Sequence, residues 1–121
     1  MLSMNKIIAA VGLVVAPALA YSGDLTWYQY NPGLGACGLT HNDGSAVVAL
    51  SRSEYGNDPN PNLAAVCGRW IAINYNGRVI HAEVADKCWG CQPGDIDVSP
   101  SLFSQVADLG VGRIQVTWEF I

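Results

Sequence analysis

The stretch Arg69–Ala85 reads RWIAINYNGRVIHAEVA, with the dipeptide Asn76-Gly77 at its centre. Asn-Gly between two runs of β-forming residues is the strongest short-range signal of a β-hairpin. Both residues tolerate the positive φ angles that a type I′ turn requires. We therefore predict two antiparallel strands, Arg69–Tyr75 and Val79–Ala85, joined by this turn.

The sequence on either side of the hairpin predicts further strands and little helix. Leu25–Tyr30 is rich in Thr and aromatic residues, and Ala46–Leu50 is a short apolar run. Apolar and polar residues alternate in Gly112–Phe120, which predicts a strand with one buried and one solvated face. Ser99-Pro100 has the residue types of a helix start, so we predict a helix from there to Gly110, after a helical turn over Ser51–Tyr55.

The composition agrees with one small, turn-rich β-domain. The chain has 121 residues, with 13 Gly, 6 Pro, 50% hydrophobic residues and only 13% charged residues. These values exclude a disordered tail. The net charge is −4 and no run of Lys or Arg occurs, which excludes a basic footprint for nucleic acid and a polybasic membrane patch. We expect one small barrel of about six strands.

Residues 1–20 are predicted to be a secretory signal peptide. A short segment with one positive charge precedes the apolar run Ile7–Ala16, and Ala18 and Ala20 are the small residues of a cleavage site. An uncleaved anchor or a buried core helix is the alternative, but the run is short for a bilayer and Pro17 interrupts it. The mature domain would be residues 21–121, outside the cell.

The four cysteines, Cys37, Cys67, Cys88 and Cys91, all lie in the predicted mature part. An even number in a small secreted domain predicts two disulfides, although the sequence allows three pairings. A four-thiolate zinc site and a redox-active pair are the alternatives. Closed zinc sites usually show two close-spaced pairs, and this chain has one. His41 and His81 are isolated, so no metal site is expected.

Several segments together resemble the expansin-related double-psi β-barrel proteins, which include the rare-lipoprotein-A-like and barwin-like domains. In chain order they are Thr26-Trp27-Tyr28, Gly35-Ala36-Cys37-Gly38, Cys67-Gly68-Arg69, Asp86–Cys91, Gly94–Ser99 and Gly112–Trp118. The chain looks most similar to the short secreted fungal forms called loosenins. The resemblance implies an all-β, six-stranded double-psi β-barrel with one or two short helices, no cofactor, and disulfides Cys37–Cys67 and Cys88–Cys91.

Two aspartates are the candidate catalytic residues. Asp86 follows apolar residues and Asp97 lies between Ile96 and Val98, so each is either hydrogen-bonded structurally or held with a raised pKa. Structurally, Asp86 could cap the following loop and Asp97 the helix near Ser99. In the resemblance, Asp97 matches the position of the general acid of family-45 endoglucanases. Asp86 matches the position of the catalytic acid proposed for rare lipoprotein A. We expect both to meet Tyr28, the third candidate, at one end of an open cleft.

The resemblance also argues against hydrolysis. A glycosidase normally needs two carboxylates, and Tyr30 stands where family-45 enzymes carry their base. Flat rings beside these segments suit a glycan. Trp89, in a loop, is predicted to be exposed, whereas Trp70 and Trp118 are predicted to be packed. The residues predicted to bind substrate are Thr26, Trp27, Tyr30 and Trp89.

Three functions follow as hypotheses. The first is a monomeric, secreted, non-hydrolytic protein that binds a wall polysaccharide such as cellulose or chitin and loosens the wall. The second is a lytic transglycosylase or weak glycosidase that uses an Asp general acid. The third is a protein-binding inhibitor or effector, as in the kiwellins and bacterial papain inhibitors that share this barrel, because a fold does not determine a function.

Overall fold

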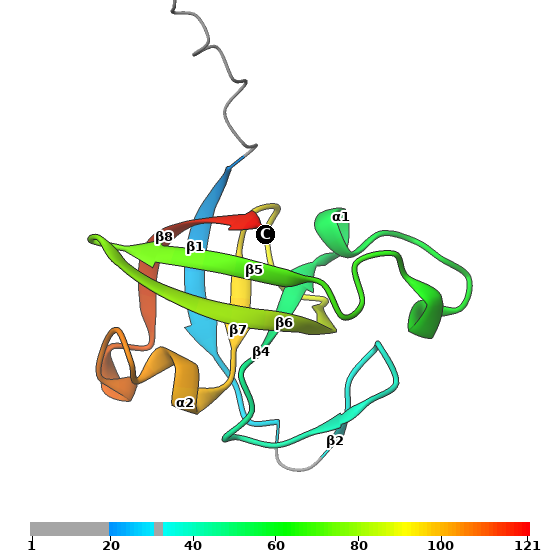
Figure 1. The fold of residues 1–121 in the computed structure, drawn as a ribbon, viewed down its shortest axis with the longest axis horizontal. Coiled ribbons are helices and arrows are strands. Elements are labelled where there is room, and N and C mark those ends of the chain that lie inside the picture. Colours follow the sequence, from blue (N-terminus) through cyan, green and yellow to red (C-terminus); the bar gives the residue numbers. More distant parts are fainter. Residues whose placement is uncertain (1–19, 31–32) are drawn as a thin grey trace, which may run out of the picture.

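The computed structural model describes residues 20–30 and 33–121, so the predicted signal peptide lies almost wholly outside the described residues. Six strands close into a barrel in the order β1-β7-β4-β6-β5-β8 (Figure 1). The barrel strands are β1 (Tyr21–Trp27), β4 (Val47–Ser51), β5 (Trp70–Tyr75), β6 (Arg78–Cys88), β7 (Ile96–Val98) and β8 (Arg113–Phe120), and β2 (Gly33–Leu34) with β3 (Thr40–His41) forms a separate two-stranded sheet. The predicted all-β, six-stranded double-psi barrel is confirmed.

The β5–β6 hairpin forms as the sequence predicts. Tyr75 pairs with Arg78, and Asn76 and Gly77 have φ angles of 50° and 84°, as a type I′ turn requires. β6 continues past the predicted end at Ala85 to Cys88. Its last residues pair in parallel with β4 beyond a bulge. This pairing joins distant segments, so the local sequence pattern could not predict the extension.

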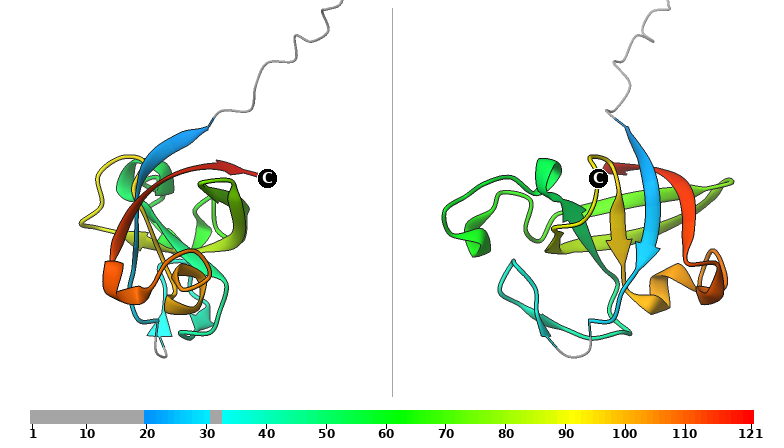
Figure 2. Two further views of the ribbon diagram at one scale, coloured as in Figure 1. Left: turned by 90° about the vertical axis from the view of Figure 1, so that its left-hand side faces the viewer. Right: turned by 180° about the vertical axis from the view of Figure 1, so that it is seen from behind.

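The sequence pattern predicted five of the six barrel strands and did not predict β7. It has three residues and lies between β1, to which it is parallel, and β4, to which it is antiparallel. Figure 2 shows β1 and β7 side by side. Ile96 and Val98 are completely buried. Burial and two hydrogen-bonded neighbours stabilise a strand that is too short to be predicted from alternation.

The helices are shorter than predicted. The helical turn after Ser51 is confirmed as α1 (Arg52–Tyr55), but α2 comprises only Pro100–Phe103 and the chain then turns towards η2 (Leu109–Val111). Ser99 does not cap α2 with its side chain and instead donates a hydrogen bond to the carbonyl of Ser45. The prediction of a helix from Ser99 to Gly110 was therefore wrong, because tertiary contacts override a weak local preference for helix. A further 3₁₀ turn, η1, spans Pro61–Leu63, and no helix among the described residues is long and apolar enough to cross a membrane.

Alternate residues of each strand fill the barrel. Ile71, Ile73 and Trp118 are almost fully buried, and the Trp118 indole donates to the carbonyl of Gly94 at 2.9 Å. Trp70 was predicted to be packed but is 42% exposed. It precedes Ile71 in β5, so strand alternation turns its side chain outward.

Both expected disulfides are present, Cys37–Cys67 and Cys88–Cys91. The first joins the segment after β2 to the segment before β5, and these two parts of the chain project from the same side of the barrel (Figures 1 and 2). The hydroxyl of Tyr55 lies beside both sulfur atoms and donates to the carbonyl of Pro61 at 2.7 Å. The disulfide and this buried phenol hold the two projecting segments together.

We expect Gly23→Ala to destabilise the barrel. A Cβ atom at Gly23 would collide with the carbonyl group of Gly94, which itself has a φ of 88°. Overpacking of this kind costs about 1–3 kcal/mol in the free energy of unfolding, which denaturant titration measures. The matched control is Gly90→Ala, because a Cβ atom at Gly90 would meet no neighbouring heavy atom within 4 Å. Equal stabilities for the two variants would contradict the close packing of β1 on the turn before β7.

Candidate functional site

The two candidate aspartates lie on opposite sides of one residue of β4. Ala49 pairs with Asp86 of β6 on one side and with Asp97 of β7 on the other. Two strand spacings put their Cα atoms roughly 10 Å apart. The barrel therefore brings residues that are 11 positions apart in the chain to the same level of its wall, across one strand.

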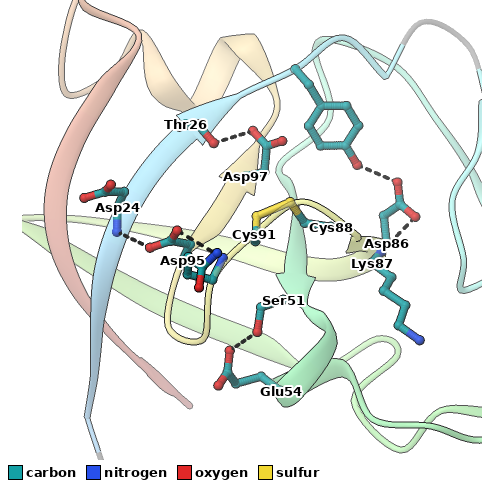
Figure 3. The surroundings of a disulfide bond; sticks show 12 residues. Asp24, Thr26, Ser51, Glu54, Asp86, Lys87, Cys88, Cys91, Asp95 and Asp97 are labelled. Atoms are coloured by element: carbon teal, nitrogen blue, oxygen red, sulfur yellow. Dashed lines mark hydrogen bonds between the residues drawn. A yellow bond between two sulfur atoms is a disulfide. The ribbon is translucent and has the colours of Figure 1, made fainter.

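Asp97 is a partly buried carboxyl group with one side-chain donor. The Thr26 hydroxyl on the paired strand β1 donates to Asp97 Oδ1 at 2.9 Å (Figure 3). The pKa of Asp97 is raised to about 6, chiefly by burial and to a smaller extent by the negative charge of Asp86. The Thr26 hydroxyl and the positive charge of Arg113 lower this pKa but do not cancel the effect of burial. Asp97 can therefore hold or donate a proton in mildly acidic solution.

Asp86 is held by three donors. Its Oδ1 accepts from the backbone N–H groups of Ala36 and Lys87, each at 2.8 Å, and its Oδ2 accepts from the Tyr28 hydroxyl at 2.6 Å. Through Ala36, Asp86 holds the loop after β2, and not the loop that follows Asp86 in the sequence, which was the structural alternative. These hydrogen bonds fix the loop after β2 and the Tyr28 side chain, which follows β1, against β6.

Tyr28 and Tyr30 form a packed pair next to Asp86. Their ring centroids lie 4.2 Å apart, and Tyr30 is 6% exposed. Burial is the largest cause that raises the pKa of both phenols. Both are therefore neutral hydrogen-bond donors at physiological pH. Tyr30, which the resemblance matches to the family-45 base, is thus a buried neutral phenol that cannot take a proton from water.

These residues line two neighbouring hollows. The larger, of about 340 Å³, contains Asp97 and the disulfide loop between β6 and β7, and its lining residues are Thr26, Cys88, Gly90, Cys91, Gln92, Asp95, Asp97 and Arg113. The smaller, of about 160 Å³, is lined by Tyr28, Gln29, Tyr30, Gly33, Leu34, Gly35 and Asp86. The structure joins Tyr28 to Asp86 directly and places Asp97 in the adjacent hollow.

The two candidate tryptophans lie in different environments. Trp89 is 67% exposed on the disulfide loop, as predicted. Trp27 packs against the core, and its indole donates to the carbonyl of Leu109 at 3.0 Å. Trp27 lines neither hollow. Its role in glycan binding stays a prediction, and the geometry favours Trp89 as the accessible ring.

The structure adds contacts that sequence reasoning missed. Arg113 and Asp24 form an ion pair of 2.9 Å beside Asp97. The alternation of β8 could have indicated that Arg113 faces outward, but its partner comes from β1, 89 positions away. Asp95 accepts from the backbone N–H of Asp24 at 2.8 Å and from that of Gln92 at 3.2 Å.

Other nearby carboxylates are also engaged. Asp43 accepts from the backbone N–H of Tyr30 at 2.7 Å. Glu54 accepts from the Ser51 hydroxyl and from the N–H of Gly94. Within the described ranges, no three His, Cys, Asp or Glu side chains are grouped as a metal ion would require. Asp97 differs from these carboxylates because it has one side-chain donor and a raised pKa, so it can donate a proton or a hydrogen bond.

Comparison with known proteins places this barrel in a family, although no family model matches the chain. The papain inhibitor of Streptomyces mobaraensis is 34% identical over 93% of this chain and 86% of its own length. Allergen Asp f 7 of Aspergillus fumigatus is 41% identical over 81% of this chain, which spans 36% of that allergen.

Solved structures agree with these relatives. The structure of the Streptomyces papain inhibitor matches with a TM-score of 0.78 and 35% identity, over 85% of this chain and 94% of that one. A mutant of the Clavibacter michiganensis expansin in complex with cellohexaose matches with a TM-score of 0.73 and 25% identity, over 85% of this chain and 50% of the expansin. The closed six-stranded barrel, its disulfides and these relatives show that the chain belongs to the expansin-related double-psi β-barrel proteins.

Proposed function

We propose that this protein is a secreted, non-hydrolytic, wall-loosening protein that binds a cell-wall polysaccharide as a monomer and uses Asp97 as its acid. One observation carries the proposal. Asp97 is a partly dehydrated carboxyl group in an open hollow, with its pKa raised to about 6, while the described carboxylates around it are committed to other contacts. A neutral carboxylic acid can hydrogen-bond a sugar hydroxyl or a glycosidic oxygen.

The same arrangement argues against hydrolysis. A hydrolase needs a second free carboxylate to activate water or to attack the sugar. Asp86 is held by three donors, and Asp24 and Asp43, the nearest substitutes in sequence for a missing base, are bound to Arg113 and to the backbone of Tyr30. By hydrogen-bonding to a glycan, Asp97 can weaken contacts between glycan chains. Without a second free carboxylate, it does not complete hydrolysis of a glycosidic bond.

The relatives support the class of ligand. An expansin at 25% identity has been solved in complex with cellohexaose, a neutral oligosaccharide. The two disulfides suit a protein of an oxidising compartment, in agreement with the predicted signal peptide. We extend this to cellulose, chitin or a related glycan as the partner of this chain.

The direct test compares wild type, Asp97→Asn and Asp108→Asn on insoluble cellulose and chitin. We expect all three to bind, and Asp97→Asn to lose most of the loosening of paper or wall strips, because an amide cannot donate the acidic proton. No reducing ends should accumulate above background. Asp108 is exposed and its side chain does not cap η2, so Asp108→Asn should behave as wild type.

Two results would contradict this proposal. Release of reducing sugars that disappears in Asp97→Asn would identify a hydrolase. Release of 1,6-anhydro-sugar products would identify a lytic transglycosylase, for which a single acid suffices.

The raised pKa predicts a pH dependence of stability. The folded protein holds the Asp97 proton more tightly than the unfolded chain does, so the free energy of unfolding should fall as the pH rises from about 4 to about 6. Asp97→Asn removes this component, which is about 1–3 kcal/mol for a partly buried group. Denaturant titrations of both proteins across this range measure it. Parallel curves for the two proteins would show that the pKa of Asp97 is not raised.

A second candidate function is inhibition of a cysteine protease of the papain type. It is favoured by 34% identity to a papain inhibitor over most of both chains. The described structure also offers a surface, because Leu34 and Leu63 are 73% and 69% exposed near the Cys37–Cys67 disulfide that ties their segments together. Exposed apolar side chains on linked loops suit a protein partner.

Enzyme assays with papain test this alternative. If the chain is an inhibitor, the double variant Leu34→Ser, Leu63→Ser should raise the inhibition constant about ten-fold or more, the scale of losing two anchor side chains. Val111→Ser is the control, because Val111 is 57% exposed in η2, away from these segments. No inhibition by wild type at micromolar concentration would reject the candidate.

A further inference from the structure

A cationic-aromatic patch lies outside the two hollows. It consists of Trp89 with Arg52 and Lys87, and a separate hollow of about 320 Å³ there is lined by Arg52, Ser53, Asn57 and Trp89. The Lys87 ammonium lies 4.3 Å from the centre of the Trp89 ring, and the Arg52 guanidinium carbon lies 5.7 Å from it. Trp89 nevertheless remains 67% exposed.

The two cations of the patch are free to bind an external anion. Among the described residues the salt bridge is that between Arg113 and Asp24, and neither Arg52 nor Lys87 takes part in it. Figure 3 shows Lys87 extending away from the carboxylate of Asp86. The Trp89 ring positions both charges by cation–π contact, and Lys87 also lies 5.3 Å from the Tyr55 ring centre. A ligand that joins a flat apolar face to a negative group would match this arrangement.

The patch is continuous with the Asp97 hollow through one short loop. Trp89 lies between Cys88 and Cys91, and both cysteines line the hollow that contains Asp97. A chain-like ligand bound at Asp97 needs to cross only this disulfide-closed loop to reach Trp89. An extended glycan therefore fits better than a separate small ligand.

We propose that the patch binds a hexuronic acid unit of the wall polysaccharide, with the carboxylate at Lys87 and Arg52 and one face of the sugar ring against Trp89. This rests on the proposed glycan-binding function and extends its ligands from neutral glycans to wall glycans that carry a uronic acid. The charge must be recognised locally, because the protein carries a net charge of −4 and the two hollows described above contain aspartates. General attraction to polyanions is not expected of such a protein.

Calorimetric titration tests the proposal with hexagalacturonic acid, its methyl ester and cellohexaose. We expect the free acid to bind about ten-fold more tightly than the ester at low salt, since two exposed ion pairs together contribute on that scale. The difference should shrink in 0.5 M NaCl, a test condition chosen because ions screen exposed charges.

Matched variants locate the effect. Arg52→Gln with Lys87→Gln should lower the affinity for the acid about ten-fold and leave the affinity for the ester unchanged. Arg78→Gln removes a positive charge from the β5–β6 hairpin, where Arg78 contacts the carbonyl of Gln105, and should change nothing. Trp89→Ala should weaken binding of both acid and ester about five-fold, because the ring contact does not depend on charge. Thermal melts show that each variant is folded.

Three results would overturn the inference. The first is equal affinity for the acid and the ester. The second is equal affinity of the Arg52→Gln, Lys87→Gln double variant and Arg78→Gln for the acid. The third is full competition by polyglutamate, which would identify an acidic polypeptide as the ligand. If cellulose or chitin binding persists while the acid shows no preference, the patch assignment fails and the proposed function stands. If the chain binds no glycan of either kind, both fail.

Discussion

Closure of the barrel through β7 is the constraint on which the site depends. β7 pairs with β1 and with β4, and it buries Ile96 and Val98 completely. Alternation along a strand then forces the residue between them, Asp97, onto the outer face. Burial of two aliphatic side chains stabilises the fold by about 1.5–3 kcal/mol each, which offsets the cost of partly dehydrating one carboxyl group. The raised pKa of Asp97 is thus a consequence of the way the barrel closes.

The two aspartates differ because their hydrogen-bond partners differ. Asp97 has one side-chain donor, Thr26, and burial dominates its pKa. Asp86 has three donors from three parts of the chain and serves to hold the loop after β2 and Tyr28 in place. Environment can separate the properties of two carboxyl groups in one site, and here it raises the pKa of Asp97 and holds Asp86 in hydrogen bonds to other segments.

The loop closed by Cys88 and Cys91 lies between the Asp97 hollow, which also contains Arg113, and the cationic-aromatic patch. On one side lie Asp95 and Asp97, and on the other Trp89 with its two cations. A disulfide across so short a loop adds little chain-entropy stabilisation. Its contribution is geometric, because it holds an exposed ring at a constant position beside the Asp97 hollow.

Local sequence patterns predict several features of this structure correctly. The Asn76-Gly77 turn, the alternation of β8 and the exposure of Trp89 follow from backbone preferences and from short-range periodicity. The even number of cysteines correctly predicts that all four are paired in disulfides. Resemblance to a family added the disulfide pairing and the candidate acid Asp97. These predictions cover most of the barrel, and they name the acid on which the proposed function rests.

Which distant residues come into contact depends on the tertiary structure. The strand β7, the outward turn of Trp70 and the inward turn of Trp27 depend on ladders and packing that local propensity does not contain. The three donors of Asp86 and the partner of Arg113 come from segments up to 89 positions away. A pattern of a few residues records which face of a strand is buried, but not which strand will lie beside it, because that pairing is set by the closure of the whole barrel.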